Sequence, residues 1–204
     1  MTTDVALRCR CGQVRGSAHG LSPWGGVHVV CYCHDCRAFA RWLGGDDILD
    51  AHGGTDIFQL PPAHVRISAG ERQLCCLRLT PQGVYRWYAG CCRTPIGNMV
   101  GPRLPVIGLI ATFMRSAAPD ADGRALTEML GRALAAHASS AVGGTPPGVH
   151  AMPQFVLTAR LLPHVLAWRI GRKHQPSAFF DAAGRPVVAP EVLSPSERAR
   201  LSTP

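Results

Sequence analysis

The sequence predicts a mainly β fold for residues 1–115, followed by a helical C-terminal extension over residues 116–204. Three observations support this division. Short segments rich in strand-forming residues fill the first part, and Gly, Pro, Asp or Asn turns separate them. Beyond residue 115, apolar residues recur at helical spacing instead. All nine cysteines precede that change, at Cys9, Cys11, Cys31, Cys33, Cys36, Cys75, Cys76, Cys91 and Cys92.

Six segments of the first part have the composition of strands, at residues 12–18, 26–33, 55–60, 64–70, 73–79 and 83–89. Cys75 and Cys76 lie in the fifth segment, so one thiol is expected in the core while the other faces out. The stretch TPIGN at 94–98 follows the last segment. We interpret it as a turn that closes a cysteine loop or as part of a substrate pocket.

The C-terminal extension has two apolar helical patterns and one capping signal. The first pattern carries Leu126, Met129, Leu130, Ala133 and Leu134. The second covers residues 155–170 and is expected to bend or begin at Pro163. In SPSER, Ser194 is expected to cap a helix, with Pro195 at its first position and Glu197 bonded to the cap amide. We expect this extension to pack on the β domain or on a second subunit of a homodimer.

Composition and charge indicate where the protein is located and which partners it has. Nine cysteines cannot all pair within one chain, and the N-terminal residues lack a basic and apolar signal pattern, so we expect a cytoplasmic protein with reduced thiols. The most apolar stretch, 155–170, is shorter than the roughly 20 residues of a membrane span. The formal charge is +8, but the basic residues are scattered except for RIGRKH at 169–174, which argues against a nucleic-acid partner.

The cysteine spacing indicates metal binding. In an extended strand residues i and i+2 share a face, so each C-x-C pair can present two sulfurs to one point. A structural zinc site takes four protein ligands, whereas a catalytic site takes three and leaves one position exchangeable. The stretch CYCHDC supplies three sulfurs by itself, from Cys31, Cys33 and Cys36. Its fourth position is therefore expected to be open.

Three stretches, CRCGQVRG, CYCHDCR and YAGCCRTPIGN, resemble the motifs of the glutathione-dependent formaldehyde-activating enzyme family, whose domain also occurs in centromere protein V. That family's pattern is C-x-C-G, then C-x-C-x2-C-R, then an aromatic residue followed by C-x2-C-G-T. The first two blocks match fully. In the third, Ala89 replaces a cysteine, Arg93 replaces a glycine, and Cys91 is an additional cysteine. The resemblance covers roughly residues 5 to 115.

The resemblance implies a Mss4-like β fold with two zinc sites. One would be structural and would contain Cys9, Cys11 and Cys92. Its fourth ligand is either Cys91 or another group, for which His19 and His28 are candidates. The second would be the open, catalytic site of Cys31, Cys33 and Cys36. Arg37 matches the motif and is a candidate partner for substrate carboxylates.

The activity implied by the resemblance is that of a zinc-dependent carbon-sulfur lyase, which forms or cleaves the adduct of glutathione and formaldehyde. The substrate would be a small thiol of the glutathione type. The alternative is a non-catalytic interaction module in which both zincs are structural. The alignment leaves Cys75 and Cys76 outside both sites.

Overall fold

Two β-sheets form the framework of the computed structural model, which describes residues 2–115, 123–144, 146 and 149–202. A three-stranded sheet has the order β1-β2-β5, and a nine-stranded sheet has the order β11-β10-β3-β4-β9-β8-β7-β6-β12. Most neighbours are antiparallel, but β10 runs parallel to β3 and β11, and β12 runs parallel to β6. The strands are β1 (Thr3–Arg8), β2 (Arg15–Leu21), β3 (Val27–Cys31), β4 (Thr55–Leu60), β5 (Val65–Ala69), β6 (Leu74–Arg78), β7 (Tyr85–Ala89), β8 (Thr94–Met99), β9 (Ile107–Ile110), β10 (Leu134–Ala136), β11 (His150–Ala151) and β12 (Glu191–Val192).

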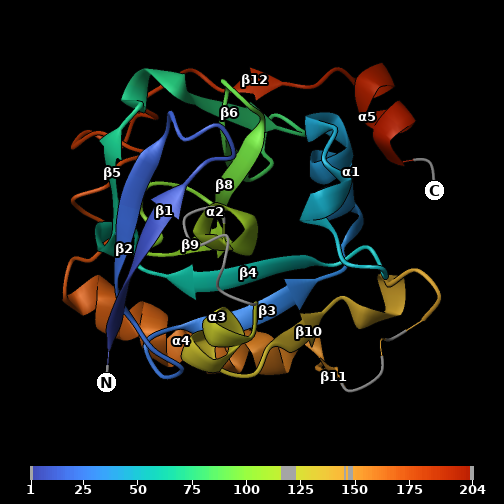
Figure 1. The fold of residues 1–204 in the computed structure, drawn as a ribbon, viewed down its shortest axis with the longest axis horizontal. Coiled ribbons are helices and arrows are strands. Elements are labelled where there is room, and N and C mark those ends of the chain that lie inside the picture. The colour runs from blue at the N-terminus through green and yellow to red at the C-terminus, as the bar shows by residue number, and fades with distance from the viewer. Residues whose placement is uncertain (1, 116–122, 145, 147–148, 203–204) are drawn as a thin grey trace.

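Five α-helices accompany the sheets in the described ranges (Figure 1). They are α1 (His34–Leu43), α2 (Ala111–Arg115), α3 (Gly123–Leu130), α4 (Gln154–Ile170) and α5 (Pro195–Ser202), and short 3-10 helices occur at Asp46–Ile48, Pro62–His64, Glu71–Gln73 and Ala138–Ser140. The prediction of a mainly β fold with C-terminal helices is confirmed. None of the helices in these ranges is both long and apolar enough to span a bilayer.

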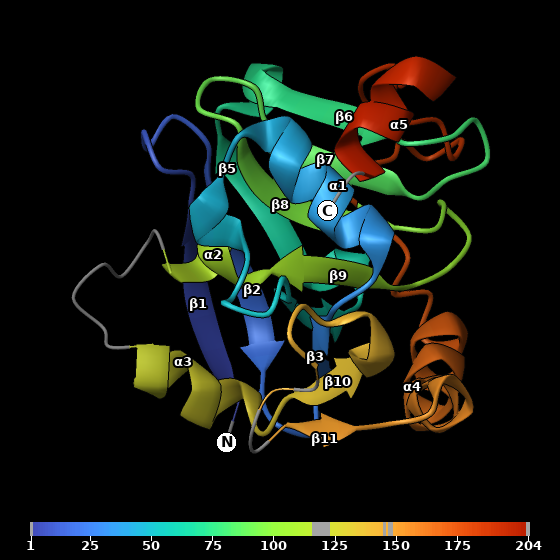
Figure 2. The ribbon, with the colours of Figure 1, turned by 90° about the vertical axis from the view of Figure 1, so that its right-hand side faces the viewer.

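Alternation along the strands gives the large sheet two apolar faces. Phe58 and Leu60 of β4 belong to the cluster that the small sheet covers, whereas Ile57 belongs to the cluster beneath α1. Helix α4 covers a third part of the sheet, where Leu157 packs on Val29 of β3. Figure 2 shows α1 over one part of the sheet and α4 beside β3 and β10.

Helix α1 has clear ends. Cys33 caps its N-terminus, and Gly44 ends it with a φ of 69°, a left-handed conformation that glycine adopts without a Cβ penalty. Asp35 in the first turn and Arg41 in the last turn complement the helix dipole. The helix therefore begins at the cysteine cluster and holds two of its thiols on a defined turn.

The C-terminal part contributes strands as well as the expected helices. Strand β10 pairs with β3, and β12 pairs with β6, so the C-terminal part completes the large sheet. The helical pattern assigned through Leu134 ends at Leu130, because Gly131 adopts a φ of 76° and Leu134 enters β10. The proposed boundary after residue 115 adjoins residues 116–122, which lie outside the described residues.

Two local C-terminal predictions are confirmed. Helix α4 covers the expected segment, but it does not begin at Pro163, which lies inside it. At the start of α5, the Ser194 amide donates to Glu197 Oε2 at 2.9 Å and the Glu197 amide donates to Ser194 Oγ at 3.3 Å, which is a capping box. Helix α5 lies beside α1 (Figures 1 and 2), where Arg41 donates to the Leu201 carbonyl at 3.2 Å.

Candidate metal centre

The first cysteine cluster joins two loops that are far apart in sequence. Cys9 and Cys11 lie in the loop between β1 and β2, and Cys91 and Cys92 lie in the turn between β7 and β8. The four Sγ atoms all lie within 4.8 Å of one another. The structure therefore brings Cys91 into the group, whereas the sequence left it as one of two alternatives.

The sulfur separations match a tetrahedral metal site. Cys9 Sγ lies 3.6 Å from Cys11 Sγ, and Cys91 Sγ lies 3.3 Å from Cys11 Sγ and 3.9 Å from both Cys9 Sγ and Cys92 Sγ. Four sulfurs placed 2.3 Å from a central zinc are about 3.8 Å apart. These four side chains could therefore hold a metal ion with little rearrangement.

Both loops contain residues with positive φ next to the cysteines, and one backbone amide donates to a cysteine sulfur. Gly12 adopts a φ of 76° directly after Cys11, and the amide of Val14 donates to Cys9 Sγ at 3.2 Å. In the second loop Arg93 adopts a φ of 55°, at the position where the resembled motif has a glycine. The Arg93 guanidinium lies over the Trp42 ring at 4.6 Å. This cation–π contact helps to hold a conformation that a non-glycine residue rarely adopts.

Hydrogen bonds prepare one of the four thiols for ionisation. Burial disfavours the Cys92 thiolate, but hydrogen bonds from the Thr94 hydroxyl and from the backbone amides of Cys11 and Thr94 outweigh burial and lower its pKa to about 6. Burial raises the pKa of Cys9, which is fully buried. A metal ion would supply the positive charge that the Cys9 thiolate requires.

The second cluster is local in sequence. Cys31 ends β3, Cys33 caps α1 and Cys36 lies in the first turn of α1. Their Sγ atoms lie within 4.8 Å of one another, and no fourth Cys, His, Asp or Glu ligand joins them among the described residues. The Cys36 amide donates to Cys33 Sγ at 3.4 Å. This is a three-thiol group at a helix N-terminus, where the helix dipole favours thiolate.

The three thiols cannot all ionise without a cation. Contacts with Cys31 and Cys36 lower the pKa of Cys33 to about 2, and the contact with Cys33 raises the pKa of Cys31. At Cys36 a hydrogen bond with Cys31 favours ionisation, but the contact with Cys33 and burial outweigh it and raise the pKa to about 11. The cluster therefore has one cysteine that ionises easily, Cys33. The other two, Cys31 and Cys36, would become thiolate ligands when a metal ion binds.

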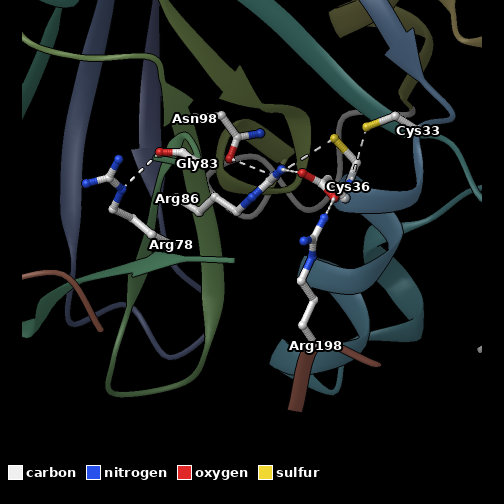
Figure 3. A network of polar contacts seen from close by, with 8 residues as sticks. Cys33, Cys36, Arg78, Gly83, Arg86, Asn98 and Arg198 are labelled. Atoms are coloured by element: carbon white, nitrogen blue, oxygen red, sulfur yellow. Dashed lines mark hydrogen bonds and ion pairs between the residues drawn. The ribbon is translucent and has the colours of Figure 1, made fainter. Parts of the chain in front are cut away.

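A buried arginine lies beside this cluster (Figure 3). Arg86 of β7 is 3% exposed, and its guanidinium is 4.0 Å from Cys36 Sγ, 3.5 Å from Asn98 Oδ1 and 3.8 Å from the Asp35 carboxylate. Its Nε atom has no hydrogen-bond partner among the described residues. A metal held by three thiolates carries a net negative charge, so the Arg86 cation fits the charge of the occupied site.

A second buried polar group faces the same cluster. Thr55 of β4 lies directly opposite Cys31 in the β3–β4 ladder, so the two side chains share one face of the sheet with Cβ atoms about 5 Å apart. Thr55 is 2% exposed, and its Oγ1 atom has no hydrogen-bond partner in the part of the chain that the structure describes. A buried hydroxyl left without a partner indicates a position where a ligand can complete its hydrogen bonding.

A cavity of about 220 Å³ adjoins Cys31 between β3, β4, β10 and α4. Its walls are mainly apolar and include Ile57 and Leu157, while His137 and Thr158 add polar groups. Cys31 of the three-cysteine cluster thus lines a small pocket, whereas Cys9 of the other cluster packs into the main core.

Other predicted residues have different surroundings. Arg37 is buried, and its guanidinium donates to the carbonyls of Tyr32 and Ser140 and lies 3.1 Å from His34 Nδ1. It joins α1 to the turn at 138–140, and its role in substrate binding stays a prediction. The described contacts of His19 are with Asp4 and Ser17, so it does not join the four-cysteine cluster.

Three other residues with metal-binding side chains, His28, Cys75 and Cys76, lie outside both clusters. His28 contacts Asp56 and the Gly131 carbonyl. Cys76 packs into the main core, and Cys75 packs partly beneath α1, so neither lies in a metal group. Sequence reasoning missed Arg86 and Thr55, because only the pairing of distant strands brings them to the cysteines.

The chain matches, over residues 1–191, the model of a family described as a Family of unknown function (DUF6151). The chain belongs to this family. The matched residues include both cysteine clusters, β10 and α4, so the strands that complete the large sheet are part of the family unit. A search of curated proteins found no match.

Proposed function

We propose that this member of the DUF6151 family is a zinc-dependent enzyme of the carbon-sulfur lyase type, which forms or cleaves the adduct of a glutathione-type thiol and a small aldehyde such as formaldehyde. One observation carries the proposal: the three thiols of Cys31, Cys33 and Cys36 converge beside a cavity, with no fourth protein ligand among the described residues. The motif resemblance to the formaldehyde-activating enzyme family supports the same reading.

The donor sets favour zinc. Thiolate is a soft ligand, and groups of three or four cysteine sulfurs are typical of zinc sites. In this proposal the cluster of Cys9, Cys11, Cys91 and Cys92 is closed and structural, because four sulfurs satisfy a tetrahedral ion. The cluster of Cys31, Cys33 and Cys36 is the reactive one.

Cys31, Cys33 and Cys36 would hold a zinc ion, which would stabilise a bound thiol sulfur as thiolate at neutral pH. In the addition, the substrate sulfur forms a bond to the carbonyl carbon, the C=O π bond breaks, and the oxygen takes up a proton. The reverse sequence cleaves the adduct. No oxidant or reductant is consumed in either direction.

The residues of the chain have separate tasks in this reaction. The Thr55 hydroxyl, which lacks a partner in the described residues, donates a hydrogen bond to the oxygen on which negative charge develops. The buried Arg86 guanidinium offsets the negative charge of the three thiolates. The apolar walls of the cavity, formed by Ile57 and Leu157, exclude water from the carbonyl group.

The proposal is tested by the zinc content of reduced protein before and after gel filtration in millimolar glutathione, together with nuclear magnetic resonance exchange between glutathione, formaldehyde and their adduct. We expect two zincs per chain, and exchange faster than in buffer. Zinc content that stays at two with glutathione retained would support binding of the thiol at the metal of the three-cysteine cluster, whereas a fall to one would show that glutathione removes this metal. Two zincs with no accelerated exchange would favour the alternative of an interaction module.

Thr55→Val refines the test, because valine keeps the shape of threonine and removes only the hydroxyl. We expect the variant to be as stable as the wild type, with exchange slowed by about 10-fold or more. Thr3→Val, at an exposed position of β1 in the small sheet, serves as the control and should leave the exchange rate unchanged. Equal rates for Thr55→Val and the wild type would remove Thr55 from the mechanism.

A further inference from the structure

A second and larger cavity lies at the opposite end of β3 from Cys31. It has a volume of about 470 Å³ and is formed by the start of β3, the segment between α3 and β10, and α4. Cavities of a few hundred Å³ are the usual size for small-molecule sites. None of the clustered cysteines lines it, so what it binds is independent of the thiol chemistry proposed above.

The ionisable groups that the structure describes around this cavity are all basic. Arg132 lies in the segment before β10, and Arg160 and His164 lie one turn apart on α4, so basic groups from two elements converge on one space. No acidic residue lines the cavity among the residues that the structure describes. The sequence itself contains no Asp or Glu between Glu128 and Asp181. The cavity therefore favours an anion, and guanidinium groups bind phosphate and carboxylate in a bidentate manner.

A buried histidine fixes the position of this basic segment. His28 of β3 is 6% exposed and lines the cavity. Its Nδ1 atom lies 2.7 Å from the Gly131 carbonyl oxygen, and its Nε2 atom lies 2.7 Å from Asp56 Oδ1. The ring therefore bridges a backbone carbonyl and a carboxylate from two different parts of the chain. This ring ties the residue before Arg132 to the sheet, which makes the site preformed.

An exposed aromatic ring completes the cavity. Trp24, in the turn between β2 and β3, is 87% exposed and lies on the cavity wall. The Gly25 amide donates to the Ser22 carbonyl at 3.0 Å and defines this turn. The apolar side chains of Val27, Leu130 and Leu134 line the same space. An indole ring exposed beside apolar side chains offers a stacking surface for a flat ring.

We propose that this cavity binds a small organic anion in which a flat ring carries a phosphate or a carboxylate group. Arg132, Arg160 and His164 hold the anionic group, and Trp24 stacks on the ring. Phosphate esters of ring compounds and aromatic carboxylic acids both fit this description. Their relative affinities show which of the two classes the cavity binds.

The test is a titration of the full, zinc-loaded protein with phenyl phosphate, benzoate and inorganic phosphate by isothermal calorimetry. We expect phenyl phosphate or benzoate to bind more tightly than inorganic phosphate, because only the first two carry a ring. The better of the two ringed probes identifies the anionic group. Failure of all three probes to bind would overturn the proposal.

Matched variants locate the site. R132Q/R160Q should weaken binding of the ringed probe by about tenfold or more, whereas Arg66→Gln, at an exposed arginine of β5, should leave it unchanged. Trp24→Ala should weaken the ringed probe and leave inorganic phosphate unaffected. These side chains are exposed, so the variants should keep the zinc content and circular dichroism of the wild type. Equal affinities for R132Q/R160Q and Arg66→Gln would assign any binding to general surface charge and overturn the proposal.

Discussion

The two cysteine clusters use the same ligand chemistry but connect different parts of the molecule. The four-cysteine cluster joins the loop after β1, in the small sheet, to the turn after β7, in the large sheet. The three-cysteine cluster takes all its sulfurs from the stretch between Cys31 and Cys36. A metal in the first cluster would crosslink the two sheets, whereas a metal in the second would bridge neighbours that the chain already connects. This difference predicts that loss of the metal destabilises the fold more at the four-cysteine cluster than at the three-cysteine cluster.

The largest effect is expected at the crosslinking cluster. Cys9→Ser or Cys92→Ser should leave the protein insoluble or unfolded, because metal binding at a structural site is folding free energy, about 10–16 kcal/mol in zinc-finger peptides. The measurements are soluble yield, far-ultraviolet circular dichroism and zinc per chain. A soluble Cys9→Ser variant with the thermal midpoint of the wild type would contradict the crosslinking role.

A smaller effect on stability is expected at the local cluster. Cys33→Ser should remain folded and lose one of two zincs, because serine is itself a good N-cap and preserves the start of α1. We expect a thermal midpoint within about 5 °C of the wild type, measured by differential scanning calorimetry. If Cys33→Ser were as insoluble as Cys9→Ser, the two clusters would not differ in the way that their connections indicate.

Cys91 sharpens the comparison within the crosslinking cluster. Cys91→Ser should release one zinc and destabilise the fold, since its Sγ lies 3.3 Å from Cys11 Sγ. Cys75→Ser is the matched control, because Cys75 is also partly buried but belongs to neither group. Zinc content by atomic absorption and the thermal midpoint decide the outcome. Retention of both zincs by Cys91→Ser would exclude Cys91 as a ligand.

The smallest effect on stability is expected for Arg86→Met, which keeps the volume of a long side chain and removes a buried charge. Metal affinity at the three-cysteine cluster should fall by about 10–100-fold, as is usual when a supporting partner of a ligand is lost. Competition with a chromogenic chelator measures it. Arg78→Met, in the neighbouring strand β6, should leave the affinity unchanged, because the Arg78 side chain donates to the Gly83 carbonyl instead (Figure 3). Equal affinities in the two variants would remove Arg86 from the site.

The sequence predicts the cysteine groups well because their spacing is local information. Two sulfurs at i and i+2, or three within six positions, converge whatever surrounds them. Cys91 was an alternative and not a firm assignment, because its place depends on how the turn between Ala89 and Thr94 directs each side chain. Arg86 and Thr55 could not be predicted, because the pairing of β3 with β4 and the packing of β7 under α1 place them.

The strands that the sequence missed have physical explanations. The stretch TPIGN was interpreted as a turn or pocket, but it lies in β8 between β7 and β9. Pro95 is tolerated there because the register of β7 and β8 shifts beside it, between Trp87 and Tyr88. Leu134 has helical spacing from Leu130, yet Gly131 ends the helix. Leu134 instead begins β10, which hydrogen-bonds to the edge of β3. Periodicity alone does not show such an edge.

The pairing of β10 with β3 also has a consequence for biosynthesis. Val29 of β3 pairs with Leu134, which leaves the ribosome much later. Until then one edge of β3 has no strand paired with it. The thiols of Cys31, the last residue of β3, and of Cys33 directly follow this edge. A nascent chain in this state can pair with another chain or form a wrong disulfide. Early capture of a metal ion by Cys31, Cys33 and Cys36 would protect these thiols while the rest of the sheet is synthesised.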